Sequence, residues 1–251
     1  MLSSRDSKKR GQVTIFILLA IIIVSTVLVY FLWAKPTYFS EKTKGLGFEN
    51  CIKDALEPVI NELGENAGFV NPEFVYSYDG KNFAYLCYTN EYYITCTVQK
   101  PFLRTHLQEQ AEKAMKEKIN ICYDSSIKEL KAQGYSVSEG KVDYQILLEP
   151  DIVRVEIDAP TTIGAQRFTR FNVKLSSPIY DMIMIATSIL QYETEYGDSD
   201  TSVLTLFYPD YIIDKIKRDD GTTVYILEDK LSGTKFQFAS RSLAWPPGYA
   251  P

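Results

Sequence analysis

Four cysteines are the residues whose type and spacing predict chemistry most directly. They are Cys51, Cys87, Cys96 and Cys122, and all of them follow a long apolar segment near the N-terminus. An even number of cysteines outside the cytoplasm predicts disulfides, and four cysteines allow three pairings. Cys87 and Cys96 flank a short loop between two expected strands, whereas Cys51 and Cys122 each lie on the apolar face of an expected helix. We therefore predict the pairs Cys51–Cys122 and Cys87–Cys96. If the two halves of the short loop are directly opposed, its centre lies between Glu91 and Tyr92.

The alternative for the cysteines is a zinc site, which the spacing disfavours. Neither pair forms a CxxC motif, and His106 is the only histidine of the chain. Structural zinc sites draw their four ligands from such closely spaced cysteines and histidines. We therefore expect no bound metal.

Other residues with catalytic potential do not form a familiar arrangement. Ser125 and Lys128 have the SxxK spacing that puts a lysine one helical turn from a serine nucleophile, but the SDN and KTG motifs that accompany it are absent. Glu193 and Glu195 are two residues apart on an expected helix, so their side chains point in different directions. His106 is expected on the surface of a helix. Because motifs for hydrolysis and nucleotide binding are missing too, we expect neither an enzyme nor a cofactor.

The apolar segment covers residues 12–34 and contains no charged side chain. At 1.5 Å per residue, roughly 20 apolar residues cross a hydrocarbon core about 30 Å thick. Tyr30 and Trp33 lie near its far end, where aromatic rings prefer the headgroup layer. Four basic residues and one acidic residue precede it, so the positive-inside rule places residues 1–11 in the cytoplasm. The sequence therefore predicts a single-pass membrane protein whose chain from residue 35 is extracytoplasmic.

The boundary between this leader and the apolar segment consists of Lys8, Lys9, Arg10, Gly11 and Gln12. A secretory signal peptide would have a shorter apolar region that ends in a small-x-small cleavage site. The arrangement instead resembles the class III signal peptide of archaeal type IV pilin-like proteins, over about residues 8–30. A prepilin-type peptidase cuts such proteins on the cytoplasmic side, so the resemblance implies cleavage between Gly11 and Gln12 with the helix retained. The alternative is a signal anchor that is never cleaved.

The chain departs from that family at one position that affects assembly. Many pilins carry a glutamate at the fifth mature position, whereas this chain has Phe16 there. We therefore expect a minor member or an isolated anchor rather than the main subunit of a long filament. The partners that the resemblance implies are the lipid bilayer, the peptidase and other pilin-like or envelope proteins.

Composition agrees with a folded extracytoplasmic part and disfavours nucleic acid as a partner. The chain has 251 residues, an apolar fraction of 45% and a net charge of −5, and the acidic excess lies beyond the basic leader. An acidic domain repels nucleic acid. Strand propensity explains most of the 18 tyrosines, and those that face solvent would suit protein contacts.

Apolar periodicity predicts an α+β fold with antiparallel sheets and amphipathic helices. The expected helices cover 48–63, 101–134 and 178–196. The expected strands lie within 73–98, 142–148, 152–157, 168–175, 204–207, 211–216, 224–227 and 235–239. Turns are expected at 149–151, near Ala159 and Pro160, and at 219–221. Pro58 should kink or break the first helix, and Asp124, Ser125 or Ser126 could cap a second helix within the long one.

These elements suggest an order of segments and two candidate functions. The segments are a leader (1–11), a transmembrane helix (12–34), a tether (35–47), a helix, small-sheet and long-helix part (48–134), a meander and helix part (135–243) and a tail (244–251). The two parts are either packed subdomains that meet near Gly134 or one domain. The expected function is that of a pilin-like, membrane-anchored protein with a structural, adhesion or envelope-assembly role through protein contacts. The alternative is a ligand-binding ectodomain of an envelope complex on an uncleaved signal anchor.

Overall fold

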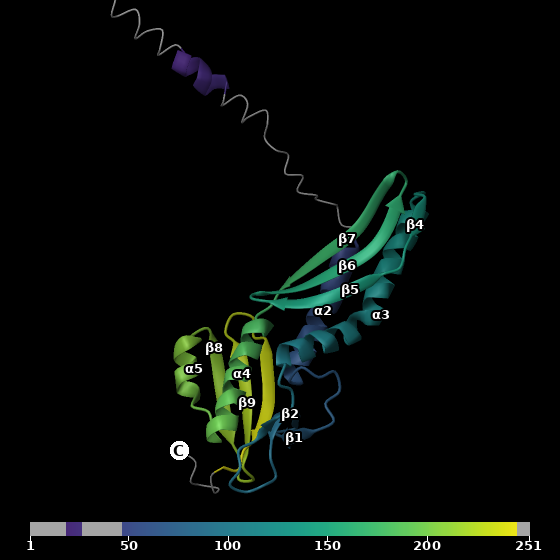
Figure 1. Ribbon diagram of the computed structural model, residues 1–251. Coiled ribbons are helices and arrows are strands. Elements are labelled where there is room, and N and C mark those ends of the chain that lie inside the picture. Colours follow the sequence, from purple (N-terminus) through teal and green to yellow (C-terminus); the bar gives the residue numbers. More distant parts are fainter. Residues whose placement is uncertain (1–18, 27–46, 245–251) are drawn as a thin grey trace, which may run out of the picture. The chain divides into compact units, whose positions relative to one another are not determined.

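The computed structural model describes residues 19–26 and 47–244 of the chain (Figure 1). Its contacts divide the chain into two units, 1–45 and 46–251, and the fold below is that of the second unit. Residues 19–26 are helical, and they are the only described part of the predicted 12–34 span. No helix within the described ranges is both long and apolar enough to cross a membrane. The predicted leader (1–11), residues 35–46 of the tether and residues 245–251 of the tail lie outside the described residues.

Helix α2 (Phe48–Glu65) begins after Gly47, whose φ of 66° is in the left-handed region. Its buried residues recur every three or four positions, which places them on one face. They include Phe48, Ile52, Leu56, Val59, Ile60 and Leu63. Pro58 is exposed and lies within one continuous helix, so of the two expected alternatives, a kink or a break, the break into two helices is wrong.

Helix α3 (Leu103–Ala132) is a single helix of 30 residues. The expected second cap within it is wrong. The Ser126 hydroxyl donates to the carbonyl of Cys122 at 3.0 Å, one turn earlier in the same helix. A serine that bonds back in this way is compatible with a continuous helix, because its hydroxyl does not compete for a free N–H group.

The first sheet has four strands and is antiparallel, as expected. Its strands are β4 (Val137–Glu139), β5 (Asp143–Glu149), β6 (Ile152–Ile163) and β7 (Gln166–Ser176). The central strand β6 pairs with the other three. The turn between β5 and β6 is confirmed, and Asp151 adopts a φ of 63° there.

The turn expected near Ala159 and Pro160 is wrong, because β6 continues to Ile163. The register between β6 and β7 shifts between Asp158 and Thr161 instead. Proline has no N–H to donate to a ladder, and a bulge is one of the places where a sheet accommodates it. The strand therefore bends at Pro160 rather than ending there.

The second sheet combines strands from both ends of the described chain. Its members are β1 (Val75–Tyr78), β2 (Lys81–Tyr88), β3 (Thr97–Val98), β8 (Tyr211–Lys217), β9 (Thr222–Asp229) and β10 (Lys235–Arg241). The order is β1-β2-β10-β9-β8, with β3 also paired to β2. Strands β2 and β10 are parallel, and all other pairs are antiparallel. The second sheet therefore contains strands from both sides of the possible subdomain boundary near Gly134, because β2 precedes that residue and β10 follows it.

Two helices accompany this sheet (Figure 1). Helix α4 (Ile179–Tyr196) ends at Gly197, as expected, with a φ of 78°. Residues 201–207 form helix α5 (Thr201–Phe207), so the strand expected at 204–207 is wrong. Asp200 caps this helix by accepting a hydrogen bond from the backbone N–H of Ser202 at 2.9 Å. Asp200 was therefore the residue in the sequence that could have predicted a helix here.

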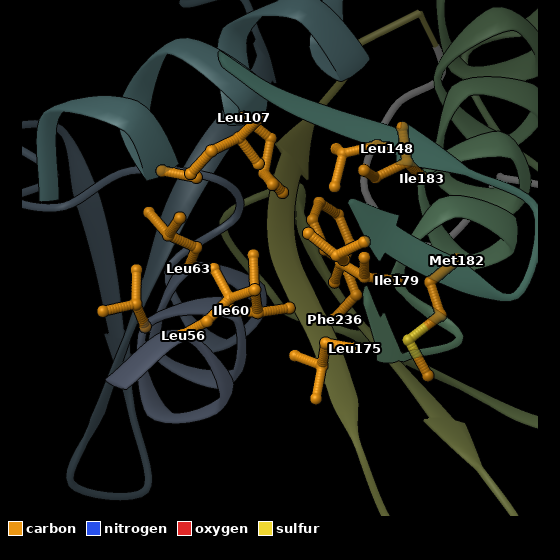
Figure 2. Close-up of a cluster of buried hydrophobic side chains, with 14 of the residues drawn as sticks. Leu56, Ile60, Leu63, Leu107, Leu148, Leu175, Ile179, Met182, Ile183 and Phe236 are labelled. Atoms are coloured by element: carbon orange, nitrogen blue, oxygen red, sulfur yellow. The ribbon is translucent and has the colours of Figure 1, made fainter. Parts of the chain in front are cut away.

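One hydrophobic core lies where the two sheets meet. Figure 2 shows Leu56, Ile60 and Leu63 of α2 near Phe236 of β10, with Leu107, Leu148, Leu175 and Ile179 close by. Gly64 marks the closest approach, because a Cβ on it would lie 2.3 Å from the backbone oxygen of Lys235. Helix α2 therefore packs directly against β10 as well as against the first sheet.

Candidate functional site

Both predicted disulfides are confirmed. Cys51 on α2 is bonded to Cys122 on α3, with 5.8 Å between their Cα atoms. Cys87 is bonded to Cys96, with a Cα separation of 5.4 Å. No cysteine in the described ranges is free. The first bond joins two helices that are distant in sequence, whereas the second closes a short loop.

The short loop has a different register from the one expected. Cys87 lies opposite Val98 rather than opposite Cys96, so the centre of the loop is one residue later. The loop is also tied to the chain that follows β10. Tyr93 N–H donates to the Leu243 carbonyl at 2.7 Å, and Leu243 N–H donates to the Ile94 carbonyl at 3.2 Å.

This loop presents apolar and aromatic side chains to solvent. Tyr92 is 66% exposed and Tyr93 is 77% exposed, with the neighbouring Ile94 at 47%. The tyrosines of β1 and β2 behave differently. Tyr76, Tyr78, Tyr85 and Tyr88 pack around Phe83 on one face of the second sheet. Strand packing therefore accounts for those tyrosines, while the loop tyrosines remain available for contacts.

A buried carboxyl group on α4 is connected to this loop by hydrogen bonds. Glu193 is 1% exposed and sits on the apolar face of α4, four residues after Ile189 and three after Leu190. The Tyr225 hydroxyl donates to Oε1 of Glu193, and Ser240 Oγ donates to Oε2 at 3.0 Å. No described residue forms an ion pair with it.

Burial raises the pKa of Glu193 from 4.5 to about 7, although the two hydroxyl hydrogen bonds and the charge of Lys215 oppose the shift. Burial also raises the pKa of Tyr225, and the neighbouring Glu193 carboxylate raises it further. The carboxyl group therefore changes charge near neutral pH while the phenol stays protonated. Because Glu193 is enclosed, this proton equilibrium affects stability rather than a bound substrate.

The hydrogen bonds of Glu193 connect α4 to the short disulfide. Ser240 Oγ lies 3.5 Å from Sγ of Cys96. Ser242 Oγ accepts from the backbone N–H of Cys96 at 3.2 Å and donates to the backbone oxygen of Glu193 at 3.5 Å. The end of α4, the end of β10 and the disulfide loop therefore share one polar network.

A pocket of about 780 Å³ opens beside this network, and we call it the Ser199 pocket. It is lined by Thr95, Tyr192, Glu195, Tyr196, Asp198, Ser199, Asp200, Thr201, Lys215 and Ala244. These residues come from the disulfide loop, the end of α4 with the start of α5, strand β8 and the chain after β10. No sequence spacing could have assembled them, because four separate segments contribute.

The charged groups of the pocket are largely engaged with one another. Lys215 Nζ lies 2.5 Å from Oδ1 of Asp198 and donates to the Ser199 carbonyl at 2.5 Å. Lys217 Nζ lies 2.7 Å from the other oxygen of Asp198. In contrast, the Ser199 hydroxyl is buried and has no hydrogen-bond partner among the described residues.

The remaining candidates from the sequence do not form a site. Glu195 is exposed while Glu193 is buried, so the two do point in different directions as predicted. Ser125 and Lys128 are both exposed on α3. The surface placement of His106 is wrong. Its ring is half-buried with its centroid 4.6 Å from that of Phe69, and its Nε2 has no partner in the described part of the chain.

The predicted processing residues lie outside the described residues. They are Lys8, Lys9, Arg10, Gly11 and Gln12. Within 19–26 and 47–244, no group of three or more histidine, cysteine or acidic side chains is arranged to hold a metal ion. Comparison of the chain with protein-family models, curated proteins and solved structures finds no match.

Proposed function

We propose that this chain is a single-pass, membrane-anchored, pilin-like extracytoplasmic protein that acts in surface assembly, adhesion or envelope organisation through protein contacts. The observation that carries this proposal is the pairing of all four cysteines in two disulfides. Such bonds persist in oxidising compartments and are rare in the cytoplasm. The basic leader and the uncharged segment 12–34 supply a sequence suited to the anchor.

The disulfide loop supports a role in protein contacts. A bond between its ends and two backbone hydrogen bonds to Leu243 restrain it. Restraint before binding reduces the entropy lost on association. Tyrosine offers a large contact area with few rotatable bonds, and Tyr92 and Tyr93 are both mostly exposed. We therefore propose that this loop contacts a partner protein.

Processing of the N-terminus tests the pilin-like part of the proposal. The mature protein should begin at Gln12, and Gly11→Val should retain the leader because the larger side chain crowds the scissile bond. Gly45→Val, a matched change in the tether, should leave processing intact. Intact mass and N-terminal sequencing of protein from the native membrane distinguish these forms. If all three proteins keep residues 1–11, the chain is an uncleaved signal anchor.

The compartment is tested separately by the state of the cysteines. Protein isolated from the envelope under non-reducing conditions should yield one peptide pair containing Cys51 and Cys122 and another containing Cys87 and Cys96. Four free thiols in that protein would contradict the extracytoplasmic location.

A second candidate function, a ligand-binding ectodomain, is favoured by the Ser199 pocket. Pockets of about 300–1,000 Å³ suit small ligands, and this one falls in that range. An unpaired buried hydroxyl is costly unless another molecule satisfies it.

A further inference from the structure

We propose that the Ser199 pocket binds a neutral saccharide. The inference rests on the second candidate function above, and it names the class of ligand. It does not depend on the membrane anchor, because every residue that carries it lies between 95 and 244. Three features of the pocket support it: an unpaired hydroxyl, a mixed set of charges and a pair of exposed aromatic rings.

Ser199 supplies the first feature. The residue is 0% exposed, yet it lines the pocket, and its hydroxyl has no partner among the described residues. A serine hydroxyl can both donate and accept a hydrogen bond. A hydroxyl group of a ligand has the same two capacities and can pair with it in either direction once a shift of the pocket wall exposes Ser199. Thr95 and Thr201 add two further hydroxyls to the wall.

The charges of the pocket favour a ligand without net charge. Lys215 and Lys217 both lie against Asp198, so this carboxylate is already paired with two cations. A cationic ligand would have to compete with both lysines to pair with Asp198. Asp200 is engaged by Ser202, and Glu195 lines the same pocket, so an anionic ligand would meet two further carboxylates. A neutral polyhydroxyl molecule meets neither this competition nor this repulsion.

Two tyrosines provide a surface suited to a sugar ring. Tyr192 and Tyr196 lie one turn apart on α4, with ring centroids 6.0 Å apart and an interplanar angle of 29°. They are 43% and 55% exposed. The face of an aromatic ring carries negative charge density. The C–H groups on one face of a pyranose carry the opposite partial charge, so the sugar can stack there while its hydroxyls face the polar residues of the same pocket.

The test is a binding measurement on the full chain in lipid nanodiscs, since sugar-based detergents would compete. The probes are methyl glycosides of glucose, galactose, mannose and N-acetylglucosamine, followed by saturation-transfer NMR and titration. Choline serves as the cationic probe. If the chain proves soluble without lipid, the same titration is run in buffer, so failure of the anchor does not remove the readout.

The expected result is saturable binding of at least one glycoside and none of choline. Tyr192→Ala should weaken binding by about tenfold, as expected for loss of an aromatic contact. Ser199→Ala should weaken binding without lowering the unfolding midpoint, because it removes a hydroxyl that has no partner in the protein. Tyr135→Ala alters a tyrosine of similar exposure that does not line the pocket, and it should bind like the wild type.

Three results would overturn the proposal. The first is no binding of any glycoside, and the second is binding of choline in place of the glycosides. The third is glycoside binding that Ser199→Ala and Tyr192→Ala leave unchanged, which would place the sugar elsewhere.

Discussion

Replacement of Glu193 by glutamine should change how stability depends on pH. The glutamine keeps the shape of the side chain and can still accept the hydrogen bond from Tyr225 and donate one to Ser240. It removes only the ionisation of a buried carboxyl group. The comparison therefore isolates the free energy of placing a negative charge in this site.

The raised pKa of Glu193 determines whether stability rises or falls with pH. Its pKa is about 7 in the folded protein, against the ordinary value of 4.5 that we take for the unfolded chain. Between those values the folded state holds a proton that the unfolded state has lost, so stability falls as pH rises through this range and levels off above it. A difference of roughly 2.5 pKa units corresponds to about 3 kcal/mol. The Glu193→Gln protein should therefore be more stable than the wild type by about 3 kcal/mol at pH 8, and by less than about 1 kcal/mol at pH 5.

Denaturant unfolding at several pH values between 5 and 8 measures this difference. Glu195→Gln is the matched control, because it makes the same chemical change on an exposed position of the same helix. Its stability should follow that of the wild type at every pH. A constant offset between wild type and Glu193→Gln across the range would show that Glu193 does not titrate there, and the reasoning from burial would be wrong.

The disulfides and the histidine give two further predictions. In the chain-entropy model, the loop closed by Cys51 and Cys122 stabilises the protein by about 4 kcal/mol, and the loop closed by Cys87 and Cys96 by about 2.5 kcal/mol. Replacing the first pair by alanine should therefore lower the melting temperature more than replacing the second pair. Equal decreases in melting temperature would contradict the loop-size argument. His106→Leu should stabilise the protein by about 1 kcal/mol at neutral pH, because it removes a buried nitrogen without a partner. Burial lowers the pKa of His106, and Lys100 lowers it further, so folding opposes protonation of this histidine. The stability gained by His106→Leu should therefore grow between pH 7 and pH 5, as measured by denaturant unfolding. A stability gain that shrinks on acidification would contradict this expectation.

Local patterns explain which parts of the fold could be predicted. Helices α2, α3 and α4 follow from apolar spacing, and β5 and β6 follow from alternation around the turn at Asp151. Apolar patterns gave the wrong element where a partner strand or a capping residue determined the local structure. The bulge at Pro160 depends on a partner strand, and α5 depends on the cap from Asp200 rather than on the strand propensity of its own residues.

Long-range pairing explains what the sequence did not predict. The parallel pairing of β2 and β10 joins residues about 150 positions apart, and no periodicity encodes it. The Ser199 pocket depends on that pairing, because Thr95 follows β2 and Ala244 follows β10. Unlike the pocket, the burial of Glu193 could have been predicted from the sequence. Its position on the apolar face of α4 was visible in the sequence as a charged residue among Ile189 and Leu190.

The two disulfides should therefore differ in their effects on stability and on binding. Cys96 directly follows Thr95, which lines the pocket, and the backbone N–H of Cys96 donates a hydrogen bond to Ser242. Loss of the Cys87–Cys96 bond would loosen that wall, whereas Cys51 and Cys122 lie on α2 and α3 and do not line the pocket. Alanine replacement of Cys87 and Cys96 should thus weaken glycoside binding more while lowering the melting temperature less. Titrations below the lower of the two melting temperatures measure the first effect, and thermal unfolding measures the second. If both effects followed the same pair, the short bond would have no separate role at the pocket.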